Sequence, residues 1–315
     1  VIVLGAWVRL SHAGLGCPDW PGCYAQLTWP SEVQEIAAAN EAFPERPVET
    51  GKAWREMVHR YLAGALILLV AALFWKSWQK TSHAYSFRWL TTTLLLLIIF
   101  QAMLGMWTVT LKLKPIIVMA HLMGGMATFS LLLWLTFSSR PSLADKPNIH
   151  VRKMRGSILA AIFVLAAQIS LGGWTSANYA ALSCPDFPTC NGQWLPDTDF
   201  SEGFVLWREI GVDYEGGILD QEARVAIHLT HRIGAVITLA VLLLLAFKAN
   251  KIPRLRSGGR LLFVLVLTQF TLGIMNVVLY LPLSNAVAHN GGAALLLANL
   301  IFLLNKTSIR DYQRT

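Results

Sequence analysis

Four histidines recur as two pairs along this 315-residue chain, each inside a long apolar run: His59, His121, His231 and His289. Ionisable residues are costly inside a bilayer and indicate a functional site there. Two imidazoles that face each other across a helix bundle can ligate heme iron from both sides. The pairs His59–His121 and His231–His289 therefore predict two heme sites. The alternative is that these residues hydrogen-bond neighbouring helices or form a proton path.

The two pairs differ one helical turn before the first histidine of each. Glu56 precedes His59 by three residues and shares its helix face, whereas His228 holds that position before His231. A carboxylate beside a macrocycle is a candidate general base or charge stabiliser; alternatively, it only favours the start of the helix. Spacing alone leaves open whether His228 or His231 is the ligand, and the repeat described below favours His231.

An arginine follows the first histidine of each pair, at Arg60 and Arg232. The forked donors of arginine suit carboxylates, so these residues are predicted to bind heme propionates. The alternative is that they extend to the outer lipid head groups. The remaining histidines are expected to be solvated and without function, and they are His12, His83 and His150.

The elements that position these residues are apolar helices, which predict an all-α integral membrane protein. The chain is 55% hydrophobic and 14% charged, against roughly 25% charged residues in soluble domains. A span needs about 20 residues. We expect spans over 57–75, 89–110, 116–137, 157–175, 225–247, 261–281 and 286–305. The opening VIVLGAW resembles the last turns of a further span, which would give eight helices in two four-helix bundles.

Basic residues indicate how the helices are oriented in the membrane. The segments 76–88, 138–156, 248–260 and 306–315 carry 16 Lys/Arg against 2 acidic residues, whereas the opposite segments carry 8 against 16. By the positive-inside rule the first set is cytoplasmic. We therefore expect a multi-pass protein of a bacterial inner (plasma) membrane with its cysteine loops in the periplasm. Basic residues spread over short loops argue against binding of nucleic acid.

An internal repeat divides the chain into two halves. CPDWPGC at 17–23 recurs as CPDFPTC at 184–190, and the histidine positions of both pairs align at similar offsets. Four spans per half make these parallel repeats. We expect a first half over 1–140 that carries the substrate heme and the chemistry. The second half, over 157–305, is expected to hold a heme for electron transfer.

All four cysteines lie in the two outer loops, where disulfides persist. Each pair brackets five residues that include two prolines, which favours the bridges Cys17–Cys23 and Cys184–Cys190, although other pairings are open. The bridges are either structural staples or, at Cys17–Cys23, redox-active. Ser31 is expected to cap a short helix in the first outer loop, and Thr50 and Asp220 to cap the spans that follow.

The combination of GLGCPDWPGC, ExxHR and AHLMGG with their repeat resembles the heme A synthase family, integral membrane enzymes of cytochrome oxidase assembly. The resemblance implies that a methyl group of heme O is oxidised to a formyl group by successive hydroxylation to a diol that loses water. It implies that His59 and His121 flank the substrate heme, that His231 and His289 ligate a heme b cofactor, and that Glu56 takes part in catalysis.

The implied partners are heme O synthase (protoheme farnesyltransferase), cytochrome oxidase assembly factors, membrane lipid, an unidentified electron acceptor and a second copy of the chain. Two other classes of protein compete with this interpretation. A non-catalytic bis-histidine b-type cytochrome that passes electrons from quinone to a partner would share the histidines but would not need Glu56. A transporter would place ionisable groups near the bilayer midplane, whereas these histidines lie toward the outer face.

Overall fold

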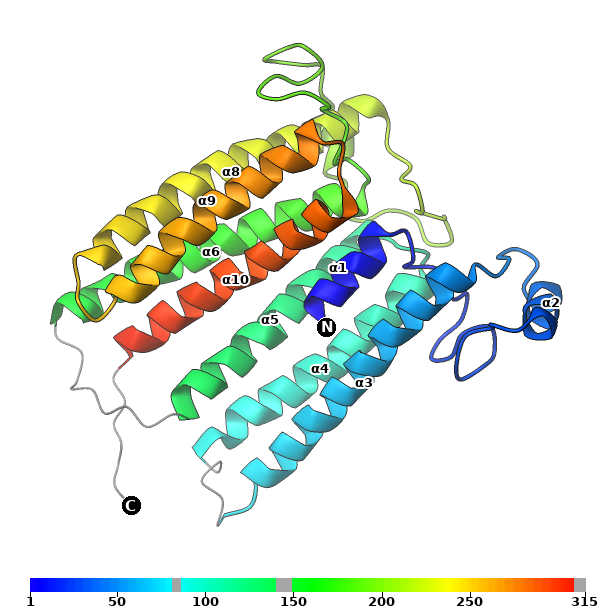
Figure 1. Cartoon of the computed structure of the whole chain (residues 1–315), viewed down its shortest axis with the longest axis horizontal. Coiled ribbons are helices and arrows are strands. Elements are labelled where there is room, and N and C mark those ends of the chain that lie inside the picture. Colours follow the sequence, from blue (N-terminus) through cyan, green and yellow to red (C-terminus); the bar gives the residue numbers. More distant parts are fainter. Residues whose placement is uncertain (81–85, 140–148, 309–315) are drawn as a thin grey trace.

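Helices make up nearly all of the regular structure in a computed structural model that describes residues 1–80, 86–139 and 149–308. The described residues form ten α-helices and no strand (Figure 1). They are α1 (Ile2–Leu10), α2 (Val33–Ala42), α3 (Thr50–Ser77), α4 (Arg88–Thr110), α5 (Pro115–Ser139), α6 (Ile149–Ala177), α7 (Phe200–Gly203), α8 (Gln221–Asn250), α9 (Arg256–Val278) and α10 (Leu283–Thr307). His83 and parts of the basic segments (81–85, 140–148 and 309–315) lie outside the described residues.

Seven helices within the described ranges are long and apolar enough to cross a membrane, namely α3, α4, α5, α6, α8, α9 and α10. This confirms the predicted all-α membrane fold. Several helices begin before the predicted spans: α3 begins at Thr50 and α6 at Ile149. The polar residues at these ends are good helix formers, so the helix continues where hydropathy has already fallen.

The long helices lie side by side and pack in the order of the repeat (Figure 1). In the second half, α6, α8, α9 and α10 form a closed ring in which each helix contacts its two neighbours. In the first half α1 contacts α3, α3 contacts α4, and α4 contacts α5. The halves meet where α5 contacts α6 and α10, and where α1 contacts α10. Helix α1 thus lies between α3 of its own half and α10 of the other half.

The outer-loop helix α2 begins differently from the prediction. Its N-cap is Glu32, which forms a capping box with Glu35. The prediction of Ser31 as the cap was wrong, because Ser31 donates its amide to Glu35 at 2.9 Å and so lies one residue outside the helix. This hydrogen bond from the Ser31 amide also lowers the pKa of Glu35.

Two N-caps were predicted for the spans that follow the outer loops, and only one of these predictions is correct. Thr50 is the first residue of α3 and Glu49 is its N-cap, so the Thr50 prediction was also wrong. Asp220 is the N-cap of α8, as predicted, although its side chain makes no capping hydrogen bond.

Candidate functional site

The four histidines lie in the spans as two intra-half pairs. His59 on α3 and His121 on α5 are close enough to interact electrostatically, and so are His231 on α8 and His289 on α10. The structure therefore brings together the residues that the repeat pairs. These pairings follow from packing within each half, because α3, α4 and α5 form one consecutive set of contacts and α8, α9 and α10 another.

Each histidine ring packs against a glycine on another helix of the same half, on α1, α4, α6 or α9. A Cβ atom on that glycine would lie 3.0 Å from Cε1 of His59, 3.3 Å from His121, 3.1 Å from His231 and 3.2 Å from His289. The glycines are Gly5, Gly105, Gly172 and Gly273, in the same order. Any side chain there would force the ring to move, since contacts this short are tighter than ordinary packing. The glycines thus fix where the rings lie.

The ring nitrogens show whether these residues suit a heme. The Nδ1 atoms of His59, His121, His228 and His289 are buried and have no hydrogen-bond partner among the described residues, whereas Nδ1 of His231 lies 3.0 Å from Gln168. Among the described residues no hydrogen bond engages Nε2 of His59, His121, His231 or His289, so this nitrogen is free to ligate iron, whereas Nε2 of His228 accepts a hydrogen bond from Arg232. Two facing imidazoles are a donor set that heme iron accepts. The residues present therefore fit a heme in each half.

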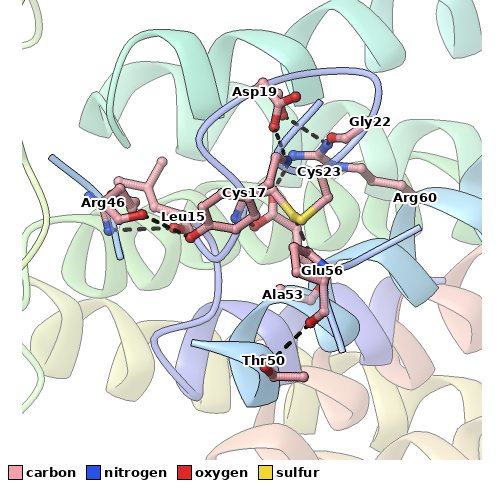
Figure 2. Close-up of a disulfide and its surroundings, with 12 residues drawn as sticks. Leu15, Cys17, Asp19, Gly22, Cys23, Arg46, Thr50, Ala53, Glu56 and Arg60 are labelled. Carbon is pink, nitrogen blue, oxygen red and sulfur yellow. Dashed lines mark hydrogen bonds and ion pairs between the residues drawn. A yellow bond between two sulfur atoms is a disulfide. The ribbon is translucent and has the colours of Figure 1, made fainter. Parts of the chain in front are cut away.

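Glu56 lies one turn before His59 and joins α3 to the first cysteine loop. Its side chain is buried, with 5% of the residue exposed. The carboxylate accepts the backbone amide of Cys17 at 3.0 Å and pairs with Arg60 at 2.5 Å (Figure 2). Two donors thus hold the carboxylate away from water, in a position to stabilise charge or accept a proton near His59.

The two arginines have partners that the sequence did not suggest, namely carbonyl oxygens of the cysteine loops. Arg60 donates to Asp19 at 3.0 Å, to Pro21 at 3.2 Å and to Gly22 (Figure 2). Arg232 donates to Cys184, Asp186 and Thr189, all at 2.8 Å. Each arginine therefore ties a cysteine loop down onto the helix that carries the histidine. This arrangement places a guanidinium beside each candidate heme site.

The cysteines are bonded within their own loops, in the pairing that the sequence favoured. Cys17 is joined to Cys23 and Cys184 to Cys190, with Cα atoms 4.9 Å and 4.6 Å apart. No cysteine of the described chain is free. Because the two cysteines of a pair are six positions apart in each case, the bridges close short loops over the outer ends of the spans.

The aspartate of the CPD motif organises each cysteine loop, a role that the sequence analysis missed. Asp19 accepts the amides of Tyr24 and Ala25 at 2.7 and 2.8 Å. Asp186 accepts the Thr189 hydroxyl and the amides of Asn191 and Gly192. The Thr189 hydroxyl, followed by these amides, lowers the pKa of Asp186. The signal that could have revealed this role was the aspartate itself, present in both copies of the motif.

The structure distinguishes His228 from His231. His231 contacts Gly172 in the same way as the other three histidines contact their glycines. His228 is 4% exposed, and its Nε2 accepts a hydrogen bond from Arg232 at 3.3 Å. His228 therefore takes the position that Glu56 takes beside Arg60. The second half has a neutral partner for its arginine where the first half has a carboxylate.

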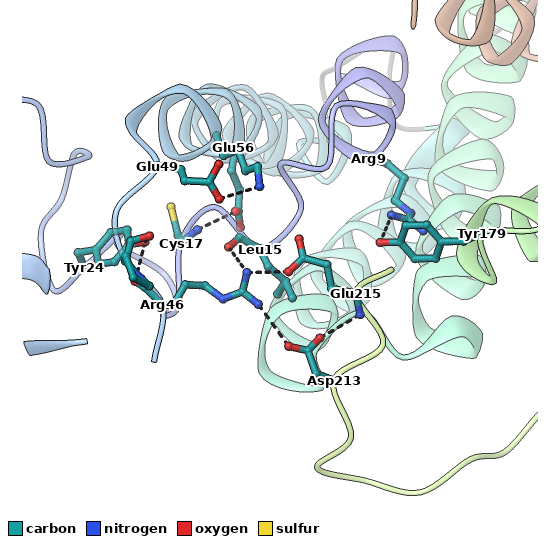
Figure 3. Close-up of polar contacts among 12 residues, drawn as sticks. Arg9, Leu15, Cys17, Tyr24, Arg46, Glu49, Glu56, Tyr179, Asp213 and Glu215 are labelled. Carbon is teal, nitrogen blue, oxygen red and sulfur yellow. Dashed lines mark hydrogen bonds and ion pairs between the residues drawn. The ribbon is translucent and has the colours of Figure 1, made fainter. Parts of the chain in front are cut away.

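Two further arginines connect the halves at the outer face, and neither was a candidate from the sequence. Arg46 in the first outer loop pairs with Glu215 at 2.7 Å and Asp213 at 3.4 Å in the second (Figure 3). It also donates to the carbonyl of Leu15 at 3.4 Å. Arg9 donates to the Tyr179 hydroxyl at 2.9 Å. The first cysteine loop is therefore braced by the second half.

Comparison with known proteins agrees with the architecture and the motifs. Residues 1–301 match the family model COX15-CtaA, cytochrome oxidase assembly protein. The chain is 47% identical over 312 residues to the heme A synthase of Shewanella oneidensis, covering 98% of this chain and 94% of that protein. It is 28% identical to the heme A synthase of Halalkalibacterium halodurans (96% and 91% covered). It is 25% identical to heme A synthase COX15 of Homo sapiens (97% and 78% covered). The chain belongs to the COX15-CtaA family of cytochrome oxidase assembly proteins.

Proposed function

We propose that this protein is a heme A synthase, an oxidoreductase that converts a methyl group of heme O into a formyl group. Family membership and the names of the relatives support this activity. The observation that carries it is the asymmetry of the two halves. A buried carboxylate, Glu56, stands one turn from His59, while the equivalent position in the otherwise similar second half is His228.

The reaction converts the methyl group to an alcohol, then to a geminal diol, which loses water to give the aldehyde. Overall, with water as the source of the oxygen, the substrate gains one oxygen atom in place of two hydrogens and releases four protons and four electrons, and the electrons pass to an acceptor. The protons released need an acceptor near the reacting carbon. Glu56 is the ionisable side chain placed for this role, and Arg60 and the Cys17 amide hold its carboxylate in place.

The first half, residues 1–140, is proposed to hold heme O between His59 and His121. The second half, residues 157–305, is proposed to hold a heme b between His231 and His289. When bound, that heme supplies one-electron redox chemistry. Arg60 and Arg232 lie next to His59 and His231, so their guanidinium charge would be available to the propionates while they hold the loops. The cysteine bridges would keep the loops closed over the two sites.

The topology supports a location in a bacterial inner membrane with the cysteine loops on the periplasmic side. The seven apolar helices of the described ranges support a multi-pass membrane protein, and two of the relatives named above are bacterial. A heme O substrate requires heme O synthase (protoheme farnesyltransferase) as its source, and its product would pass to cytochrome oxidase assembly factors. A second copy of the chain and an electron acceptor complete the proposed partners.

The test is extraction and chromatography of the hemes from the purified protein, made in cells that also produce heme O. The wild type is expected to hold heme b together with heme A or its hydroxylated precursor. Glu56→Gln is expected to retain heme b and accumulate heme O, with formation of heme A lowered by at least about a hundredfold.

The matched control is His228→Gln, which changes the equivalent position of the second half. It is expected to leave the first-half carboxylate intact and so to keep making heme A. If both the wild type and Glu56→Gln hold only heme b, the protein is a bis-histidine cytochrome and not a synthase. If no variant holds any heme, the assignment of the histidine pairs is wrong.

A further inference from the structure

Three of the four paired histidines share a second contact besides the glycine, and it comes from a glutamine. The glutamine lies four residues before the glycine on the same helix, in QAMLG (101–105), QISLG (168–172) and QFTLG (269–273). Its side-chain amide donates to the backbone carbonyl of the histidine. The distances are 2.8 Å from Gln101 to His121, 3.0 Å from Gln168 to His231 and 2.9 Å from Gln269 to His289.

A second glycine on the histidine's own helix makes room for this glutamine. It lies three residues after the histidine, at Gly124, Gly234 and Gly292. A Cβ atom at any of these glycines would overlap the Oε1 atom of the corresponding glutamine. Glutamine and glycine together therefore form a clamp, because the glutamine can reach the carbonyl only where the side chain is missing. The side-chain nitrogen of Gln168 (Nε2) also lies 3.0 Å from Nδ1 of His231.

His59 is the exception, because both parts of the clamp are replaced. The position four residues before Gly5 is Val1, and the position three residues after His59 is Leu62. Gly5 still contacts the His59 ring, so the histidine itself is equivalent to the others. No hydrogen bond from a neighbouring helix reaches its backbone carbonyl in the described part of the chain. Its Nδ1 has no partner there, as is also the case for His121 and His289, so the clamp is what distinguishes it.

This difference matters because a hydrogen bond to the backbone carbonyl of a ligating histidine holds that histidine in place beside the neighbouring helix, and groups around the ligands help to orient them. A cofactor heme stays in place, so both of its ligands benefit from a clamp. A substrate heme must enter and leave in every turnover, which requires at least one histidine ligand to dissociate from the iron. Of the two histidines of the first half, His121 is clamped and His59 is not.

We propose that His59 is the exchangeable ligand of the substrate site, and that Gln101, Gln168 and Gln269 are positioning residues that hold the other three histidines. This inference rests on the proposed heme A synthase function, since it assigns the exchange of substrate and product to one named ligand. It extends that function by giving the two ligands of the substrate heme unequal roles.

The experiment measures the rate at which heme moves from the purified, heme-loaded full chain to excess apomyoglobin. Chromatography of the transferred heme distinguishes heme O from heme b, so each half is followed separately. In the wild type, heme O is expected to leave at least about tenfold faster than heme b. Gln269→Leu is expected to speed release of heme b by roughly tenfold and to leave the heme O rate unchanged.

The reciprocal variant rebuilds the missing clamp with Val1→Gln and Leu62→Gly together. It is expected to slow release of heme O by about tenfold, without changing heme b. The low-spin bis-histidine signal in electron paramagnetic resonance is expected to sharpen for the first-half heme. In each variant the heme of the other half is the internal control, because a general loss of folding would change both rates.

The inference is overturned if the rebuilt clamp leaves the heme O rate unchanged, or if Gln269→Leu releases both hemes equally fast. These results do not depend on turnover. They are therefore separate from the Glu56→Gln test, in which continued production of heme A would overturn the role of Glu56 and not the clamp.

Discussion

The carboxylate of Glu56, inside a membrane helix, accepts a hydrogen bond from the backbone amide of Cys17 at 3.0 Å. Cys17 is itself bonded to Cys23, so the disulfide loop and the proposed catalytic carboxylate form one unit (Figure 2). The second half repeats the loop and its arginine, but His228 stands there in place of the carboxylate. In the first half the loop motif therefore also holds the Glu56 carboxylate in place.

This contact predicts unequal effects when each disulfide is removed. Cys17→Ser with Cys23→Ser frees the amide that holds Glu56, and formation of heme A is expected to fall by roughly ten- to a hundredfold, because a small misplacement of a reacting group is costly. Cys184→Ser with Cys190→Ser is the matched control and is expected to lower activity much less. Equal losses in both variants, measured by heme chromatography, would show that the bridges act only through general stability.

A second prediction concerns the glycines against which the rings pack. Gly105→Ala places a Cβ atom 3.3 Å from the His121 ring and is expected to lower heme O content while sparing heme b. Gly273→Ala is expected to do the reverse, because its Cβ would lie 3.2 Å from the His289 ring.

The control for both glycine variants is Gly64→Ala. Gly64 lies on α3, and a methyl group added there would have no neighbouring side chain or backbone within 4 Å. This change is expected to be neutral or to stabilise the helix by about 0.5–1 kcal/mol. The heme-to-protein ratios of the three purified variants, read from absorbance and chromatography, check the pattern. A loss of both hemes in every variant would contradict it.

The ion pair between Arg46 and Glu215 predicts a salt-sensitive contribution to stability. Both side chains are about a quarter exposed (28% and 26%), so solvent screens the pair. Arg46→Ala is expected to cost about 0.5–1 kcal/mol of unfolding free energy at low salt and less at high salt. The exchanged pair Arg46→Glu with Glu215→Arg is expected to restore part of the loss in thermal melts. A difference in melting between wild type and Arg46→Ala that does not change with salt would argue against the pairing.

The second cysteine loop is expected to loosen in acid because of Asp186. Its pKa is lowered from the ordinary value of 3.8, mainly by the Thr189 hydroxyl and then by the amides of Gly192 and Asn191. A lowered folded-state pKa means that the ionised carboxylate stabilises the loop above pH 3.8. This stabilisation is lost as the pH falls through the lowered value.

Amide hydrogen exchange of residues 184–193 is expected to be protected at about pH 6 and to lose relative protection, after correction for the intrinsic rate, as the pH falls below 3.8. Asp186→Asn is expected to remove this pH dependence, because the amide side chain does not titrate. Persistent protection of the wild-type loop at low pH would show that the disulfide alone maintains it.

The sequence by itself predicted the two cysteine pairs and the seven apolar spans of the described ranges. Apolar runs, the doubled CPDxPxC motif and the aligned positions of His59 and His231 are all one-dimensional patterns, and the structure has the corresponding helices and intra-half pairs. Periodicity and spacing are local properties, so they can be read without knowing where distant segments lie. The predicted ends of the helices were less accurate, because hydropathy marks the apolar part of a helix and not its last hydrogen-bonded turn.

Only the tertiary structure decided which backbone atoms the polar side chains reach. Arg60 was expected to meet propionates or lipid head groups, and it donates to the carbonyls of the cysteine loop. Gln101 contacts the carbonyl of His121 on another helix. Every residue has a backbone carbonyl and nearly every residue an amide, so the sequence carries no mark of which one will be a partner. That choice depends on how the loops and helices pack in space.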